Sequence, residues 1–339
     1  MGLTLVAVAA TVLASLALAA CGSGGSDSTS STEATGTTAS SDSSHEGKSI
    51  AIVMPESVPG YAKQIGCGAF EEGQNLGFDV GQPQGPTQGQ NAAEQQQILQ
   101  SVLATDPDGL VFSAVDPTAG GNAIKPAVEE GLPVVAVDVE LTDPSLAISF
   151  VSSSHEEGGE LGGELLAKQI GESGEVIGIG VIPDNPITIG RITGFENAME
   201  KYPEIEVVGV KYPAFDVNAI AAETSALLAQ HPDLKGIYTT NDTIAAGVAT
   251  ALRQAQKVGQ VKVITWDLQP VGIKLLQEGV VTGSVVQDPR EEGRMAVQQL
   301  ANEFDGKPVQ KMIKGPLKTI ENTEIDDPAV KKMYYSNSC

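Results

Sequence analysis

The sequence predicts an α/β protein made of two doubly wound parallel-sheet lobes. From Lys48 onward, short and nearly continuous apolar runs alternate with segments of helical spacing, which is typical of parallel strands covered by helices on both faces. The alternation comes in two successive series, which meet near Ser153. The chain has 339 residues, enough for two domains, and 41% of them are hydrophobic, enough for two cores.

The first series begins with a buried strand and a helix that Gly77 ends. The next helix places Ile98, Leu99, Val102 and Leu103 on one face, and a Pro/Gly turn introduces the strand after it. Strands are expected at 49–54, 109–113, 132–138 and 148–152, and helices at 61–76, 88–105 and 118–130.

The second series repeats the pattern. Asn241 and Asp242 suit the start of a helix, because their side-chain oxygens can accept from free backbone N–H groups. Helices are expected at 155–170, 190–201, 217–230, 244–252, 270–278 and 290–304, and strands at 176–181, 206–210, 237–239, 261–267 and 280–287.

Residues 1–47 lie outside this alternation. Leu3 to Ala20 is one apolar, alanine-rich run, and it resembles a secretory signal peptide (1–20) followed by a bacterial lipobox in which Cys21 carries the lipid. No Lys or Arg precedes the run, and an uncleaved membrane anchor is the alternative. The Ser/Thr/Gly-rich segment 21–47 is expected to be a flexible tether that holds an extracytoplasmic lipoprotein on the outer face of the cell membrane.

The net charge limits the classes of partner, and the cysteine content limits the possible disulfides. The formal net charge of −23 argues against nucleic acid, because binding phosphates requires clusters of Lys and Arg. Besides Cys21, the chain has only Cys67 and Cys339. Outside the cytoplasm these two thiols can pair, which would pin the C-terminal tail to the first helix, but the sequence does not fix their separation.

Polar and aromatic residues gather where the expected strands end, and Arg191 stands in the first turn of the helix expected at 190–201. In a parallel sheet, the carboxyl ends of the strands are where ligands are held. The candidates at the strand ends are Glu56, Tyr61, Asp138, Phe215, Asn241, Asp267 and Gln287.

Three of the candidates also have a purely structural interpretation. Asn241 could serve only as a helix cap, and Asp267 could cap the helix at 270–278. Arg191 could be a solvated surface residue. Trp266 precedes Asp267 on a strand, so its side chain should point to the opposite face, either into the core or at the rim of the cleft.

Four motifs in this order resemble the ribose-binding family of periplasmic sugar-binding proteins, which shares its fold with the effector domains of lac-repressor-type regulators. The resemblance covers about residues 48 to 320. The motifs are Arg191-x-x-Gly194-Phe195, Asn241-Asp242, Val263-Ile-Thr-Trp-Asp267 and Val286-Gln287-Asp288-Pro289.

The resemblance implies a type I periplasmic-binding-protein fold with a three-segment hinge. The crossovers between the lobes are then expected near Ser153, Gln287 and Pro316. The N-terminal lobe would comprise 48–153 plus 288–316, and the C-terminal lobe 154–287 plus 317–339.

The resemblance also implies roles for the candidates. Asp138 would accept hydrogen bonds from sugar hydroxyls and Arg191 would donate them, with Asn241, Asp267 and Gln287 completing the polar set. Phe215 and Tyr61 would cover the C–H faces of the sugar ring.

The first-lobe half of the site departs from the family. Val139 stands where a second arginine is common. Pro55, followed by Glu56, stands where a polar residue is expected after the first strand, and Pro59 replaces the asparagine of the first loop. These changes suggest a guest with different hydroxyl stereochemistry, or one with a cationic group near Glu56.

The expected function is capture of a monosaccharide or related polyol by hinge closure and its delivery to the permease of an ABC importer, by a monomer that requires no cofactor or metal. A sensory receptor that signals to a membrane partner is one alternative. A glycosidase that uses Asp138 and Asp267 is another, but no nucleophile elbow, metal-spaced His pair or phosphate loop supports an enzyme. A regulator of the same fold would need an N-terminal helix-turn-helix, and a lipobox stands there instead.

Overall fold

The computed structural model describes residues 45–56, 60–87, 91–180, 182–335 and 339. The predicted signal peptide, the lipidation residue Cys21 and the tether up to residue 44 lie outside this range. The predicted end of the tether at residue 47 was wrong: His45 is 4% exposed and its ring stacks on Phe78, with 4.3 Å between ring centroids. Among the described residues, no helix combines the length and the apolar character needed to cross a membrane.

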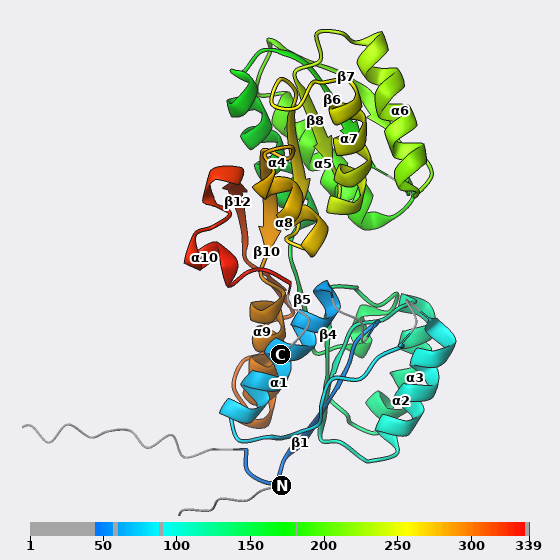
Figure 1. The fold of residues 1–339 in the computed structure, drawn as a ribbon. Coiled ribbons are helices and arrows are strands. Elements are labelled where there is room, and N and C mark those ends of the chain that lie inside the picture. Colours follow the sequence, from blue (N-terminus) through cyan, green and yellow to red (C-terminus); the bar gives the residue numbers. More distant parts are fainter. Residues whose placement is uncertain (1–44, 57–59, 88–90, 181, 336–338) are drawn as a thin grey trace, which may run out of the picture. The chain divides into compact units, whose positions relative to one another are not determined.

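The first lobe is built on a six-stranded parallel sheet with the order β11-β5-β4-β3-β1-β2. Strands β1, β4 and β5 of this sheet are labelled in Figure 1. Its strands alternate between two cores: Val111 and Val135 face the cluster that contains α1 and α9, and Leu110 and Val134 face the cluster that contains α2 and α3. The strands are β1 (Ser49–Val53), β2 (Asp79–Val80), β3 (Gly109–Phe112), β4 (Val134–Val137), β5 (Ser149–Ser152) and β11 (Met312–Lys314). The helices are α1 (Tyr61–Asn75), α2 (Ala92–Leu103), α3 (Pro117–Glu129), η1 (Pro144–Leu146) and α9 (Pro289–Phe304).

The second lobe is built on another six-stranded sheet, with the order β12-β10-β9-β8-β6-β7. All its pairs are parallel except β10 with β12, which is antiparallel and was not predicted. The strands are β6 (Gly174–Ile179), β7 (Ile205–Lys211), β8 (Gly236–Thr239), β9 (Lys262–Trp266), β10 (Gly283–Gln287) and β12 (Leu317–Glu321). The helices are α4 (His155–Ile170), α5 (Pro186–Met199), α6 (Val217–Gln230), α7 (Asp242–Gln254), α8 (Pro270–Gln277), η2 (Asn322–Glu324) and α10 (Pro328–Lys331).

The chain passes between the two sheets three times: between β5 and α4, between β10 and α9, and between β11 and β12. Helix α9 follows a strand of the second sheet but packs on β4 and β5 of the first. The crossovers lie near Ser153, Gln287 and Pro316. The prediction of two doubly wound lobes joined by a three-segment hinge is confirmed.

Helix α5 begins four residues before the predicted start at 190, so Arg191 lies in its second turn and not in its first. The Asn185 side chain caps the helix by accepting from the N–H groups of Ile187 and Thr188 at 2.9 and 3.2 Å. Gly194 lets α5 approach α4, because a Cβ at this position would collide with the carbonyl of Glu156. The helix start was missed although Asn185-Pro186 has the signature of a cap followed by a first-turn proline.

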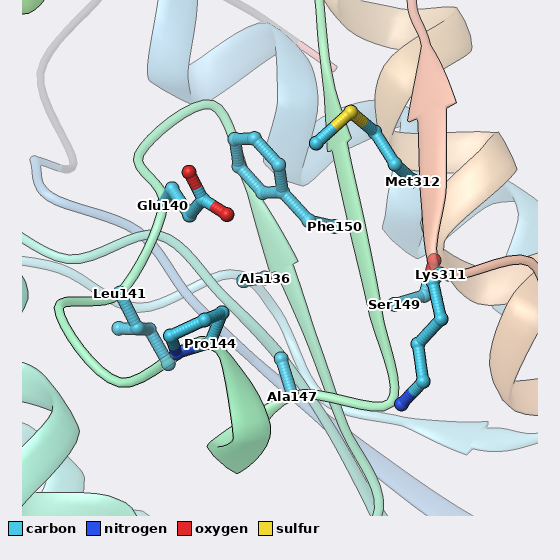
Figure 2. A pocket seen from close by; sticks show the side chains of 9 residues that line it. All are labelled: Ala136, Glu140, Leu141, Pro144, Ala147, Ser149, Phe150, Lys311 and Met312. Atoms are coloured by element: carbon cyan, nitrogen blue, oxygen red, sulfur yellow. The ribbon is translucent and has the colours of Figure 1, made fainter.

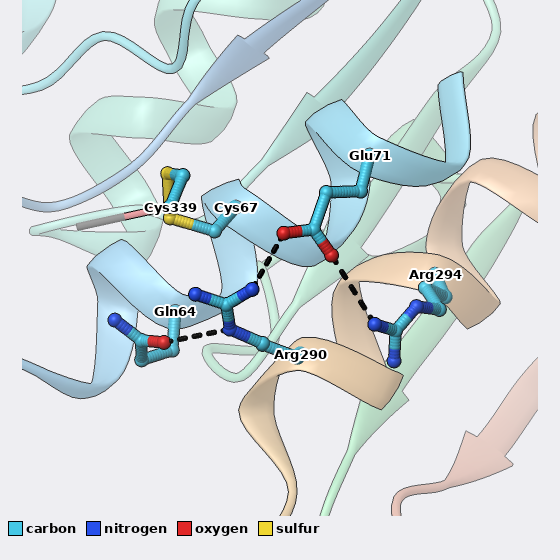
Figure 3. Close-up of a disulfide and its surroundings, with 6 residues drawn as sticks. All are labelled: Gln64, Cys67, Glu71, Arg290, Arg294 and Cys339. Atoms are coloured by element: carbon cyan, nitrogen blue, oxygen red, sulfur yellow. Dashed lines mark hydrogen bonds and ion pairs between the residues drawn. A yellow bond between two sulfur atoms is a disulfide. The ribbon is translucent and has the colours of Figure 1, made fainter. Parts of the chain in front are cut away.

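The structure joins Cys67 in α1 to Cys339 in a disulfide, with 5.1 Å between the Cα atoms (Figure 3). The last residue of the tail, which the sequence assigned to the second lobe, is thus bonded to a helix of the first. Beside the disulfide, Arg290 of α9 donates to Gln64 at 2.8 Å and to Glu71 at 2.5 Å. The disulfide is therefore a fourth covalent link between segments assigned to different lobes.

Candidate functional site

Two aspartates occupy equivalent positions at the strand ends of the two lobes. Asp138 directly follows β4, and Asp267 directly follows β9. Both have positive φ angles, of 65° and 70°. Each backbone N–H donates to the neighbouring strand at 2.8 Å, to the carbonyl of Val151 in the first lobe and of Val285 in the second. The two aspartates therefore have the same backbone conformation at the same position of their sheets.

The carboxylate of Asp267 is the centre of a buried polar cluster. Its Oδ1 accepts from Nε2 of Gln287 at 2.7 Å and from the hydroxyl of Tyr335 at 2.9 Å. Its Oδ2 lies 3.9 Å from a guanidinium nitrogen of Arg191. The cap interpretation of Asp267 is wrong, because the residue before α8 is Gln269 and no side chain caps that helix.

Arg191 is 6% exposed, so its interpretation as a solvated surface residue is wrong. Its guanidinium lies 3.7 Å from the ring centroid of Trp266 and donates to the carbonyl of Thr240 at 2.6 Å. Trp266 is fully buried and therefore belongs to the core. The tryptophan face supports the cation from one side, and the nearby carboxylate of Asp267 offsets its charge.

A chain of hydrogen bonds joins the two lobes through Gln287. The hydroxyl of Tyr61, the first residue of α1, lies 3.1 Å from Oε1 of Gln287 and 2.6 Å from Oε2 of Glu292 in α9. Ser153, at the first crossover, donates to Oε1 of Glu292 at 2.5 Å. Tyr61 and Gln287 therefore bring the first-lobe helix α1 to the Asp267 cluster.

Burial makes two carboxyl groups of this region weaker acids. It raises the pKa of Asp138 to about 7, with the charge of Asp267 adding to the rise and that of Arg191 opposing it. Burial likewise raises the pKa of Glu292 to about 7, against the hydrogen bonds from Ser153 and Tyr61. Among the described residues, no donor lies within hydrogen-bond distance of the Asp138 carboxylate, so it retains full acceptor capacity.

Asn241 caps α7, with its Oδ1 accepting from the N–H of Ile244 at 2.9 Å. The cap interpretation therefore accounts for the amide oxygen of Asn241 but not for its amide nitrogen. The amide nitrogen has no partner among the described residues, so both of its N–H groups remain available to a guest.

Two predicted residues lie outside the cluster. Phe215 is 59% exposed, directly before Asp216, the residue that caps α6. Glu56 lines a separate cavity of about 290 Å³ together with Lys63 and Cys339, and partial burial raises its pKa. The structure thus brings Tyr61, Arg191, Asp267 and Gln287 together and leaves these two outside.

A further cavity, of about 180 Å³, lies in the first lobe beside β4, β5 and β11 (Figure 2). Its charged lining residues are Glu140 and Lys311, whose side chains lie apart from one another in Figure 2. None of the predicted residues lines it. It therefore does not identify the predicted site.

Two cluster members were missed. Glu292 was not among the predicted residues, yet it lies four and eight residues before Ala296 and Leu300 on the buried stripe of α9, and this spacing can be read from the sequence. Tyr335 lies in the tail, where no periodicity points to a site. The pairing of Cys339 with Cys67 was the one available hint, because Cys67 lies in the helix that Tyr61 begins.

The arrangement is suited to binding polar, hydroxyl-rich molecules. It combines carboxylate acceptors (Asp138, Asp267) with guanidinium and amide donors (Arg191, Gln287, Asn241), and charge-assisted hydrogen bonds of this kind are the stronger ones. Among the described residues, no group of three His, Cys, Asp or Glu side chains could hold a metal ion.

Comparison with known proteins supports the same conclusion. Residues 50–308 match the model of the periplasmic binding protein domain. The ribose import binding protein of Escherichia coli K12 is 26% identical over 262 residues, which cover 77% of this chain and 86% of that protein. The D-ribose/D-allose-binding protein of Pseudomonas aeruginosa is 29% identical over 217 residues, covering 61% and 66% of the two chains.

Solved structures agree with the fold. An arabinose-binding protein from Geobacillus stearothermophilus superposes with a TM-score of 0.76 at 26% identity, covering 83% of this chain and 98% of that one. An ABC transporter solute-binding protein from Agrobacterium vitis, bound with α-D-tagatopyranose, has a TM-score of 0.72 at 26% identity, covering 85% and 99%. These relatives are binding proteins and not enzymes, so the glycosidase alternative is set aside. The chain belongs to the periplasmic binding protein domain family.

Proposed function

We propose that this chain is the substrate-binding lipoprotein of a sugar ABC importer and that it captures a monosaccharide or a closely related polyol. The observation that carries the proposal is the cluster of Asp267, Gln287 and Arg191 at the strand ends of the second lobe, with Tyr61 joined to it from the first. The relatives support the ligand class, since they are named for ribose, allose, arabinose and apiose.

Binding proceeds by hinge closure about the three crossovers. The guest docks first on the second lobe, where Arg191, Asp267 and Gln287 already hold one another in place, and Asp138 then contacts it from the first lobe. Contacts with both lobes stabilise the closed form, because a ligand shifts a conformational equilibrium by its differential affinity for the two states. Closure also removes water, so a guest that lacks one hydroxyl leaves buried polar groups unpaired and is rejected.

The protein acts outside the cytoplasm as a monomer, tethered through a lipid on Cys21, and presents its closed form to the permease. Replacing Cys21 with Ser removes the site of lipidation, so the protein should move from the membrane fraction to the soluble fraction of expressing cells. A Cys21→Ser variant that stays in the membrane fraction would favour an uncleaved membrane anchor.

A thermal-shift screen of the purified protein tests the ligand assignment. A guest at 100 times its Kd should stabilise the folded state by about 2.7 kcal/mol by mass action. The panel should contain ribose, allose, apiose, arabinose and tagatose, together with polyols. It should also contain amino sugars, because the carboxylate of Glu56 could pair with a cationic group on the guest.

The best guest is then titrated calorimetrically into the wild type and two arginine variants. Arg191→Ala should lose measurable binding, whereas Arg253→Ala, which changes an exposed arginine paired with Glu278, should bind like the wild type. The proposal fails if no compound in the panel raises the melting temperature, or if Arg191→Ala retains wild-type affinity.

A further inference from the structure

Tyr335 of the C-terminal tail lies against both lobes. Its hydroxyl donates to Oδ1 of Asp267 at 2.9 Å, and its backbone N–H donates to the carbonyl of Leu268 at 3.1 Å. Its ring meets the ring of Tyr61 edge to face, with 5.8 Å between the centroids. The side chain is 3% exposed. A residue in the tail is thus placed among side chains from the strand ends of the second lobe and the first helix of the first lobe.

The disulfide limits how far this tyrosine can move. Cys339 follows Tyr335 by four residues, and four residues of fully extended chain span at most about 14 Å. Because Cys339 is bonded to Cys67 in α1, Tyr335 stays close to α1 whatever the hinge does. On the other side, α10 keeps the tail on the second lobe, where Val330 packs into the core.

We propose that Tyr335 is a specificity-determining residue of the sugar site and that the Cys67–Cys339 disulfide positions it there. This inference rests on the proposed sugar-binding function and adds to it a residue from the tail. The hydroxyl of Tyr335 and the amide of Gln287 both donate to Oδ1 of Asp267, so they fix the rotation of the carboxylate. Oδ2, on the side of Arg191, is then the oxygen presented to a guest hydroxyl.

The ring of Tyr335 has a second effect. Together with Tyr61, it forms an aromatic corner next to Asp267. An aromatic surface covers the apolar C–H groups of a sugar ring and limits the size of substituent that the site accepts. Tyr335 therefore acts through the orientation of Asp267 and through the shape of the site.

The test compares Tyr335→Phe with Tyr334→Phe. The first variant keeps the ring and removes the hydroxyl from Asp267, so the Kd for the best guest should rise about tenfold, as expected for loss of a hydrogen bond to a charged group. Tyr334 donates to the carbonyl of Ile325 away from Asp267, so Tyr334→Phe should leave the Kd unchanged. An unchanged Kd in Tyr335→Phe would overturn the role of the hydroxyl.

The role of the disulfide is tested by a double-mutant cycle with Cys339→Ser. The single variant should bind several-fold more weakly, and Tyr335→Phe should cost less affinity in the Cys339→Ser background than in the wild type, because the tyrosine is no longer held. If the disulfide only stabilised the fold, Cys339→Ser would lower the melting temperature, and the effects of Cys339→Ser and Tyr335→Phe on the binding free energy would be additive. That result would overturn the positioning role. Absence of sugar binding by the wild type would refute the proposed function itself, so the two failures are distinguishable.

Discussion

Asp138 and Asp267 have the same backbone arrangement but different surroundings. A serine on the next strand donates to the carbonyl of each, Ser152 to Asp138 at 3.3 Å and Ser284 to Asp267 at 3.0 Å. The side chain of Asp267 accepts two hydrogen bonds and lies near Arg191, whereas that of Asp138 has no donor among the described residues. Burial raises the pKa of Asp138 to about 7, and the charge of Arg191 opposes this rise.

This difference indicates a division of work between the lobes. The second lobe holds its polar groups in fixed positions, and such a preorganised surface loses little entropy when a guest docks. The first lobe offers an acceptor that has no donor among the described residues and is therefore open to a guest. The prediction is that variants of the two aspartates affect stability in opposite directions while both weaken binding.

The largest effect is expected for Asp267→Asn. The amide removes the charge near Arg191 and weakens two hydrogen bonds, so affinity for the best guest should fall by about 100-fold or more. The free energy of unfolding should fall by about 1–3 kcal/mol, because a buried guanidinium loses its nearest carboxylate. Calorimetry and denaturant unfolding measure the two quantities; unchanged stability would show that the cluster is not preorganised by Asp267.

The next effect is expected for Arg191→Lys. Lysine keeps the positive charge but cannot stack its ammonium group as a planar guanidinium does on Trp266. Affinity should fall by roughly 30-fold, with the hydrogen bond to the Thr240 carbonyl weakened as well. Wild-type affinity in Arg191→Lys would show that charge alone, and not the stacked geometry, serves the site.

Asp138→Asn should weaken binding about tenfold and yet stabilise the ligand-free protein. The folded pKa of about 7 lies above the ordinary value of 3.8, so the folded state holds a proton that the unfolded chain releases between these values. Ionisation of Asp138 therefore lowers stability as the pH rises through this window. The variant should melt higher than the wild type at about pH 8, and its advantage should shrink towards about pH 4. A constant difference across this pH range would contradict the assignment.

The smallest effect is expected for Phe215→Ala. The ring is 59% exposed and lies outside the Asp267 cluster, so affinity should change less than about threefold. A loss of tenfold or more would show that the ring joins the site on closure and would return Phe215 to the set of ligand contacts.

Most of the fold could be predicted from the sequence, because buried parallel strands and amphipathic helices leave periodic patterns. Helix α4 begins and ends where predicted. The exceptions lack periodicity: β2 has two residues, β11 has three, and β12 is antiparallel to β10 because the chain re-enters the second sheet from β11. Their positions are decided by tertiary pairing and not by local propensity.

The candidate site likewise contains residues that could be predicted from the sequence and residues that could not. Residues directly after a strand, such as Asp138 and Asp267, could be found because the end of a strand fixes where they lie. Tyr335 could not be found in this way, because its position depends on the disulfide between Cys339 and the distant Cys67. Phe215 shows the converse: a residue can have the expected neighbours in sequence and still lie outside the cluster.

A crystal structure of the protein with its best guest tests the central claim most directly. We expect one sugar or polyol whose hydroxyls lie within hydrogen-bond distance of both the Asp138 and the Asp267 carboxylates, with Arg191 donating to the same molecule. A guest bound elsewhere, or one that contacts only the residues of a single lobe, would contradict the account.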